Sequence, residues 1–65
     1  MTTQVRMAND IAAQFGYLPP QAAARAVANH LRSFWEPRLR AELVRHVAAG
    51  GAGLDPIVIE AAALL

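Results

Sequence analysis

The sequence predicts an all-α protein, a small bundle of three to four short helices that forms a single domain over residues 1–65. Two observations predict this fold class. Apolar side chains recur at three- and four-residue spacings along most of the chain, which is the period of a helix with one buried face. Prolines and glycines fall between these stretches, where they end one helix and start the next. The expected helices span about 3–15, 20–35, 37–49 and 56–64.

The first helix should begin near Thr2 or Thr3, because either hydroxyl can accept a hydrogen bond from the free amides of a first turn. One apolar stripe follows, formed by Val5, Ala8, Ile11, Ala12 and Phe15. Gly16 ends the helix, since glycine readily adopts the positive φ that follows a helix C-terminus. Tyr17 and the two prolines after it form a connector. We expect the Tyr17 ring to pack against the corner that follows the second helix, with contact to a partner as the alternative.

The second helix carries two neighbouring apolar rows. At about 100° per residue, one row consists of Ala23, Val27, His30 and Phe34, and the other of Ala24, Ala28, Leu31 and Trp35. Together the rows are wider than the stripe that a single core contact requires. Two interpretations stay open. Either one row faces the protein's own core and the other faces a partner, or the bundle wraps this helix on both sides.

Pro37 places a corner between the second and third helices. A proline disfavours the α conformation in the residue before it and clashes with a helix that continues through it. The third helix therefore starts at Pro37, with Glu36 as a weak N-cap. Its inward side chains should be Leu39, Leu43, Val44 and Val47. The two aromatic residues Phe34 and Trp35 lie at this corner.

A glycine-rich segment, residues 50–53, should form a flexible connector. Asp55 then predicts the start of the last helix as its N-cap, with Pro56 at the first helical position. Leu54 is placed to pack on Ile59 as a hydrophobic staple. A helix this short is not stable alone in water. Its apolar side chains must therefore dock on the bundle or on a partner.

Composition favours a protein that is completed by a partner. A chain of 65 residues buries only about 60% of its unfolded surface, and such small scaffolds usually depend on disulfides, a metal or a partner. The sequence has no cysteine, and its two isolated histidines make a poor zinc site. The apolar fraction of 55% indicates that some apolar surface faces another protein.

Charge and hydropathy argue against several classes of function. A net charge of +1 is unlike that of a dedicated nucleic-acid-binding domain, which carries a basic patch. No apolar run reaches the length of about 18 residues that marks a membrane-spanning helix. The N-terminus lacks the basic and apolar layout of a signal peptide. We therefore expect a cytoplasmic protein.

No residue pattern indicates catalysis by this chain. His30 lies on an apolar row, where packing is its expected role, and neither Asp10 nor Glu36 is placed beside it as an acid or base. The segment 50–53 lacks the lysine of a phosphate-binding loop. Three arginines near the corner stay open between a solvated face, a protein interface and contact with phosphates: Arg32, Arg38 and Arg40.

The corner and two flanking segments resemble a known family. The run His30-Leu31-Arg32-Ser33-Phe34-Trp35-Glu36-Pro37-Arg38-Leu39-Arg40, preceded by Met7-Ala8-Asn9-Asp10-Ile11-Ala12 and followed by Leu54-Asp55-Pro56, is similar to the delta subunit of cytosolic NAD-dependent, molybdenum-containing formate dehydrogenases. The resemblance covers nearly the whole chain. This chain has Glu36 where aspartate is most common and Leu39 where methionine is common. The first difference weakens the expected cap of the third helix.

The resemblance implies an accessory subunit without catalytic residues or a cofactor of its own. The complex would oxidise formate to carbon dioxide and pass the electrons to NAD. Its large alpha subunit would hold molybdenum bis-pterin guanine dinucleotide and iron-sulfur clusters, and other subunits would hold flavin and bind NAD. The delta subunit would support assembly, cofactor maturation or stability of the large subunit.

We expect this chain to bind the large subunit through the corner, with contacts from His30, Arg32, Phe34, Trp35, Pro37 and Arg38. Tryptophan and arginine are the residue types most enriched at interface hot spots. An alternative stays open, a self-associating helical module or a small nucleic-acid-binding regulator. Salt titration separates the nucleic-acid version, because phosphate binding weakens steeply with salt.

Overall fold

The computed structural model describes residues 3–65 and consists of four α-helices there: α1 (Thr3–Gln14), α2 (Pro20–Phe34), α3 (Pro37–Ala48) and α4 (Pro56–Ala63). The all-α prediction is confirmed. Each helix begins at the predicted residue and ends one residue earlier than predicted. The proposed cap at Thr2 lies outside the described residues.

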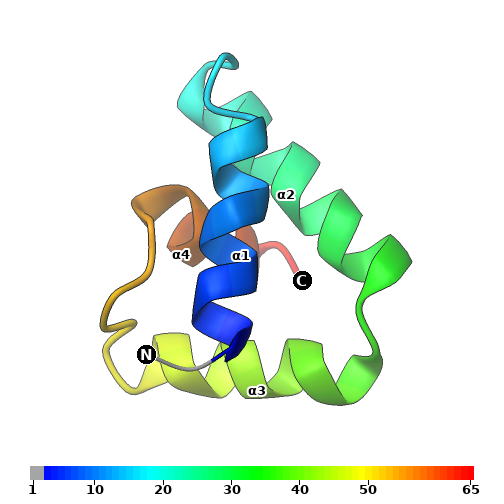
Figure 1. Cartoon of the computed structure of the whole chain (residues 1–65), viewed down its shortest axis with the longest axis vertical. Helices are drawn as coiled ribbons and strands as arrows, with labels where there is room; N and C mark the ends of the chain where they lie inside the picture. Colours follow the sequence, from blue (N-terminus) through cyan, green and yellow to red (C-terminus); the bar gives the residue numbers. More distant parts are fainter. Residues whose placement is uncertain (1–2) are drawn as a thin grey trace.

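The four helices surround one core (Figure 1). In this view α1 stands upright, α3 crosses below it, and α2 descends along one side. Every pair of helices is in contact, and the contact between α2 and α4 is the most extensive. The largest fully buried side chains come from all four helices and are Leu31, Leu43, Val5, Val27 and Val58. The short α4 is therefore docked on the bundle.

The corner between α2 and α3 follows the backbone rule for residues before proline. Trp35 leaves the helical conformation with φ −92° and ψ 141°, and Glu36 is extended with ψ 147°. Pro37 then occupies the first position of α3, where its missing N–H costs no hydrogen bond. The Glu36 side chain makes no capping hydrogen bond, which agrees with the prediction that glutamate is a weak N-cap.

The predicted N-cap and the predicted proline are both present at the start of α4. The Asp55 carboxylate accepts a hydrogen bond from the Ile57 N–H at 2.8 Å, and Pro56 occupies the first turn. A second side chain supports this cap from α1. Asn9 donates to the Gly53 carbonyl at 2.9 Å and accepts from the Asp55 N–H at 2.8 Å. The Asn9 amide thus fastens the loop before α4 to α1.

The glycine-rich segment closes α3 with the hydrogen bonds of a Schellman motif. The Gly51 N–H donates to the His46 carbonyl at 2.9 Å, and the Gly50 N–H donates to the Val47 carbonyl at 3.0 Å. Both glycines have positive φ, which residues with a side chain rarely adopt. Gly51 is buried. The flexibility expected of residues 50–53 stays a prediction.

The burial of α2 corrects the idea that a whole apolar row of this helix stays open. Ala24, Ala28, Leu31 and Trp35 are all buried, and so are Ala23 and Val27 of the other row. Only the end of that second row is uncovered, with His30 half-buried and Phe34 75% exposed. The interpretation in which the bundle wraps α2 on both sides is therefore correct for most of its length.

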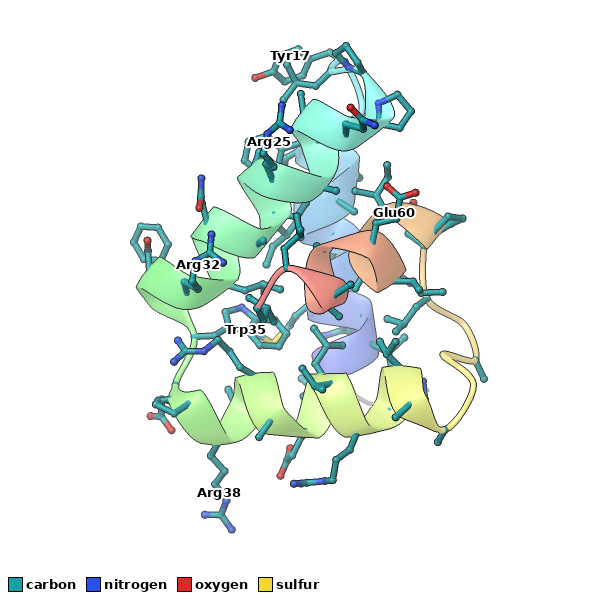
Figure 2. The ribbon with its side chains drawn as sticks, turned by 180° about the vertical axis from the view of Figure 1, so that it is seen from behind. Tyr17, Arg25, Arg32, Trp35, Arg38 and Glu60 are labelled. Atoms are coloured by element: carbon teal, nitrogen blue, oxygen red, sulfur yellow. The ribbon has the colours of Figure 1, made fainter. Side chains whose placement is uncertain are left out.

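Two smaller expectations are also wrong. Tyr17 is 79% exposed and does not pack against the corner. It lies at the other end of α2 (Figure 2). Val44 was expected to face inward but is 41% exposed, because Leu43 takes the buried position beside it and α3 crosses the bundle end with a narrow inner face.

Candidate functional site

The residues singled out from the sequence meet at one corner of the molecule. His30, Arg32 and Phe34 lie on the last turns of α2, Trp35 caps that helix, and Pro37 and Arg38 begin α3. We call these six residues the α2–α3 corner. They divide into groups that the fold uses internally and groups that it leaves at the surface.

Trp35 belongs to the core. Its side chain is 7% exposed and packs in the same cluster as Leu31 and Leu43. Figure 2 shows it pointing into the space between α2, α3 and α4. The backbone N–H of Trp35 donates to the Leu31 carbonyl at 3.1 Å. Trp35 therefore anchors the corner from inside and does not present its ring at the surface of this chain.

Phe34, the neighbour of Trp35, points the other way. Its ring is 75% exposed, and its only described ring contact is with His30 one turn earlier, at 4.8 Å between ring centroids and 42° between planes. This tilted arrangement is typical of favourable ring pairs. The His30 ring, which is half-buried, thus holds an aromatic side chain that the bundle does not cover.

Two arginines near the corner close helix ends. Arg40 donates from Nη1 to the carbonyls of Trp35 at 2.7 Å and Arg32 at 3.0 Å, with a longer bond to Leu31 at 3.3 Å. Arg32 donates from Nη1 to the Leu64 carbonyl at 2.9 Å. A cation at a helix C-terminus also offsets the partial negative charge there. Arg40 therefore closes α2, and Arg32 closes α4.

Arg38 has no such partner within the bundle. Its side chain is exposed and projects away from α3 (Figure 2). Among residues 3–65 its guanidinium makes no hydrogen bond or ion pair. It lies in the first turn of α3, which contains no acidic residue. A cation is unfavourable at this end of a helix, where the partial charge is positive.

Two of the cavities in the described part of the chain lie away from this corner. One of about 150 Å³ lies between α1 and α3 and is lined by Gln4, Val5, Glu42, Leu43 and His46. Its polar groups are engaged, since Gln4 donates to the Glu42 carboxylate and His46 Nε2 lies 2.8 Å from the Ala52 carbonyl oxygen. The other, of about 330 Å³, lies between α2 and α4 and is lined by Gln21, Ala24, Arg25, Glu60 and Leu64.

Neither a metal centre nor a membrane span is found in the part of the chain that the structure describes. No three histidine, cysteine or acidic side chains of residues 3–65 gather where they could hold a metal ion. None of the four helices there has both the length and the apolar character needed to cross a bilayer.

The polar roles of Asn9 and Arg40 were not predicted from the sequence. Asn9 bonds to residues 44 and 46 positions away, and Arg40 reaches back to the end of the preceding helix. The only signal was indirect. Asn9 and Leu54-Asp55-Pro56 belong to the segments that carry the family resemblance, and the structure brings these distant segments together.

Comparison with known proteins gives a family match. The family model described as NADH-dependent formate dehydrogenase delta subunit FdsD matches residues 4–62, a range that includes the whole α2–α3 corner and the Asn9 contacts. No curated protein and no solved structure gives a significant match to the chain.

Proposed function

The chain belongs to the family of delta subunits of NADH-dependent formate dehydrogenases, and from this premise we propose that it is a non-catalytic accessory subunit of such a complex. It binds the large alpha subunit, which carries the molybdenum cofactor and the iron-sulfur clusters, and supports that subunit's assembly, cofactor maturation or stability. The chain itself holds no cofactor. The complex works in the cytoplasm, and flavin and NAD bind to other subunits.

The observation that carries this proposal is the exposed Phe34 ring. A ring that is 75% exposed leaves a large apolar area in water, although Trp35 beside it is buried. Exposed aromatic side chains supported by rigid neighbours are typical of protein interfaces. The α2–α3 corner is held in place by Trp35, which packs in the core, and by Arg40, which donates hydrogen bonds to carbonyls at the end of α2.

The six corner residues contribute in different ways. His30, Phe34, Pro37 and Arg38 supply the contact surface. Trp35 and Arg32 support that surface, since the Trp35 ring is buried and Arg32 is bonded to the Leu64 carbonyl. A substitution of Trp35 should therefore weaken binding only indirectly, by changing the structure of the corner.

The proposal is tested by producing the formate dehydrogenase complex with and without this chain. With a tag on the chain, the large subunit should co-purify with it through size-exclusion chromatography. Without the chain, the large subunit should contain less molybdenum and iron per polypeptide, or should unfold at a lower temperature. Failure to co-purify, together with unchanged metal content, unchanged formate oxidation and unchanged thermal stability, would contradict the proposed function.

A further inference from the structure

Several side chains of the segment that joins α2 to α3, residues 30–40, have a role within the fold. Trp35 fills the core, Arg32 closes α4, and Arg40 closes α2. Each of these side chains has an internal role that accounts for its chemistry. Two side chains of the same segment, Phe34 and Arg38, have no comparable role in the described residues.

Both of these side chains act against the stability of the isolated chain. Phe34 exposes three quarters of its accessible surface, and exposed apolar area is unfavourable in water. Arg38 places a positive charge in the first turn of α3, at the positive end of the helix. That turn contains no acid, and the preceding Glu36 at the N-cap makes no capping hydrogen bond. Departures from local stability rules that have no compensation within a fold are expected at functional positions.

The neighbours of these side chains prepare them for a partner. The His30 ring contacts Phe34 and restricts it, so that less conformational entropy is lost when the ring is buried. Pro37 fixes the start of α3 one residue before Arg38. A guanidinium on a fixed helix start can form paired hydrogen bonds with a carboxylate, which are stronger and more directional than those of a lysine.

Resting on the proposed function, we infer that Phe34 enters an apolar pocket of the large subunit and that Arg38 pairs with an aspartate or glutamate carboxylate beside that pocket. The partner surface is thus a protein surface with an acidic side chain next to an apolar recess. The charge follows from Arg38, whose guanidinium makes no hydrogen bond or ion pair within residues 3–65, and the recess follows from the exposed Phe34 ring.

The test measures the dissociation constant between the full chain and the formate dehydrogenase complex prepared without it. The test variants are Phe34→Ala, Arg38→Glu and Arg38→Lys. Tyr17→Ala is the matched control for Phe34, because the Tyr17 ring is 79% exposed at the far end of α2. Arg25→Glu is the matched control for Arg38→Glu, because it makes the same charge change at an exposed position in the middle of α2.

We expect Phe34→Ala and Arg38→Glu each to raise the dissociation constant by at least about tenfold, and Arg38→Lys to raise it less. Both control variants should bind as the wild type does. The emission of Trp35, the only tryptophan, reports whether the corner is intact in every variant. Arg38→Glu should also raise the melting temperature of the isolated chain, because an acid replaces a base at a helix N-terminus.

If the wild-type chain binds the complex and neither Phe34→Ala nor Arg38→Glu weakens that binding, this inference is overturned and the proposed function stands. Equal weakening by Arg25→Glu and Arg38→Glu would also overturn it, since net charge alone would then explain the effect. A wild-type chain that does not bind the complex would overturn the proposed function itself.

Discussion

The Arg40 guanidinium on α3 donates a hydrogen bond to the Trp35 carbonyl at the end of α2, with 2.7 Å between Nη1 and the oxygen. The same nitrogen donates to the Arg32 carbonyl at 3.0 Å. One side chain thereby satisfies carbonyls that the end of a helix leaves without partners and ties two helices together across Pro37. The corner is consequently defined by polar contacts outside as well as by the buried Trp35 ring inside.

Arg40→Ala should destabilise the bundle by about 1–2 kcal/mol, because the last carbonyls of α2 lose a charged donor that is only partly exposed. Urea unfolding followed by Trp35 emission measures this change. Arg38→Ala is the control, and it should leave the free energy of unfolding within about 0.5 kcal/mol of the wild type. Equal effects of the two substitutions would show that the Arg40 contacts contribute no stability.

Trp35→Ala should unfold most of the isolated chain. Truncation of a buried aromatic side chain costs about 3–5 kcal/mol, which is a large part of the stability that so small a domain can have. Far-UV circular dichroism should show a loss of helix. A Trp35→Ala chain with full helical signal and a cooperative melt near that of the wild type would contradict the placement of this ring in the core.

Asn9→Ala should cost about 1–2 kcal/mol, because it removes the two hydrogen bonds that hold the Gly53 carbonyl and the Asp55 N–H. The neighbouring and exposed Asp10 supplies the control, Asp10→Ala, which should change stability little. Hydrogen exchange adds a local measurement. The amides of α4 should exchange faster in Asn9→Ala, and unchanged exchange there would exclude a role for Asn9 in docking α4.

Gly51→Ala should destabilise the protein by about 1 kcal/mol or more. Gly51 has φ +66°, and an added Cβ would lie 3.2 Å from Ile59 Cδ1. Gly16→Ala is the control, since an added Cβ there would have ordinary spacing of 3.4 Å from the Ala13 carbonyl oxygen. Thermal melts of the two variants compare the positions directly. A Gly51→Ala melt at or above that of Gly16→Ala would disagree with the packing of this loop on α4.

Arg38→Glu should stabilise the isolated chain by about 0.3–1 kcal/mol at low salt, because a negative charge is favourable at a helix N-terminus. The gain should shrink as salt rises. Urea titrations at low and high salt measure it. If Arg38→Glu stabilises the isolated chain and also weakens its binding to the complex, Arg38 contributes to binding and lowers the stability of the free subunit.

The helix boundaries could be predicted from the sequence because local rules fix them. Pro20, Pro37 and Pro56 each start a helix, and the Asp55 carboxylate caps α4 as its position next to a proline indicates. These features depend on residues only one or two positions apart. The same local rules place the break between α2 and α3 at Trp35 and Glu36.

The side that the bundle covers could not be predicted, because it depends on how distant elements dock. Trp35 is buried because α3 and α4 pack beside the end of α2. The helical period alone does not distinguish the row that ends in the buried Trp35 from the neighbouring row that ends in the exposed Phe34. The contacts of Asn9 and Arg32 likewise join residues more than thirty positions apart. Tertiary packing, which no short sequence window contains, decides these outcomes.

The most direct measurement is the amount of large subunit that co-purifies with a tagged chain carrying either Phe34→Ala or Tyr17→Ala. The two substitutions remove aromatic rings of nearly equal exposure, 75% for Phe34 at the end of α2 and 79% for Tyr17 in the connector before α2. An accessory subunit that binds through the α2–α3 corner should lose most of the large subunit with Phe34→Ala and retain the wild-type amount with Tyr17→Ala. Equal recovery with both variants would contradict binding through the corner.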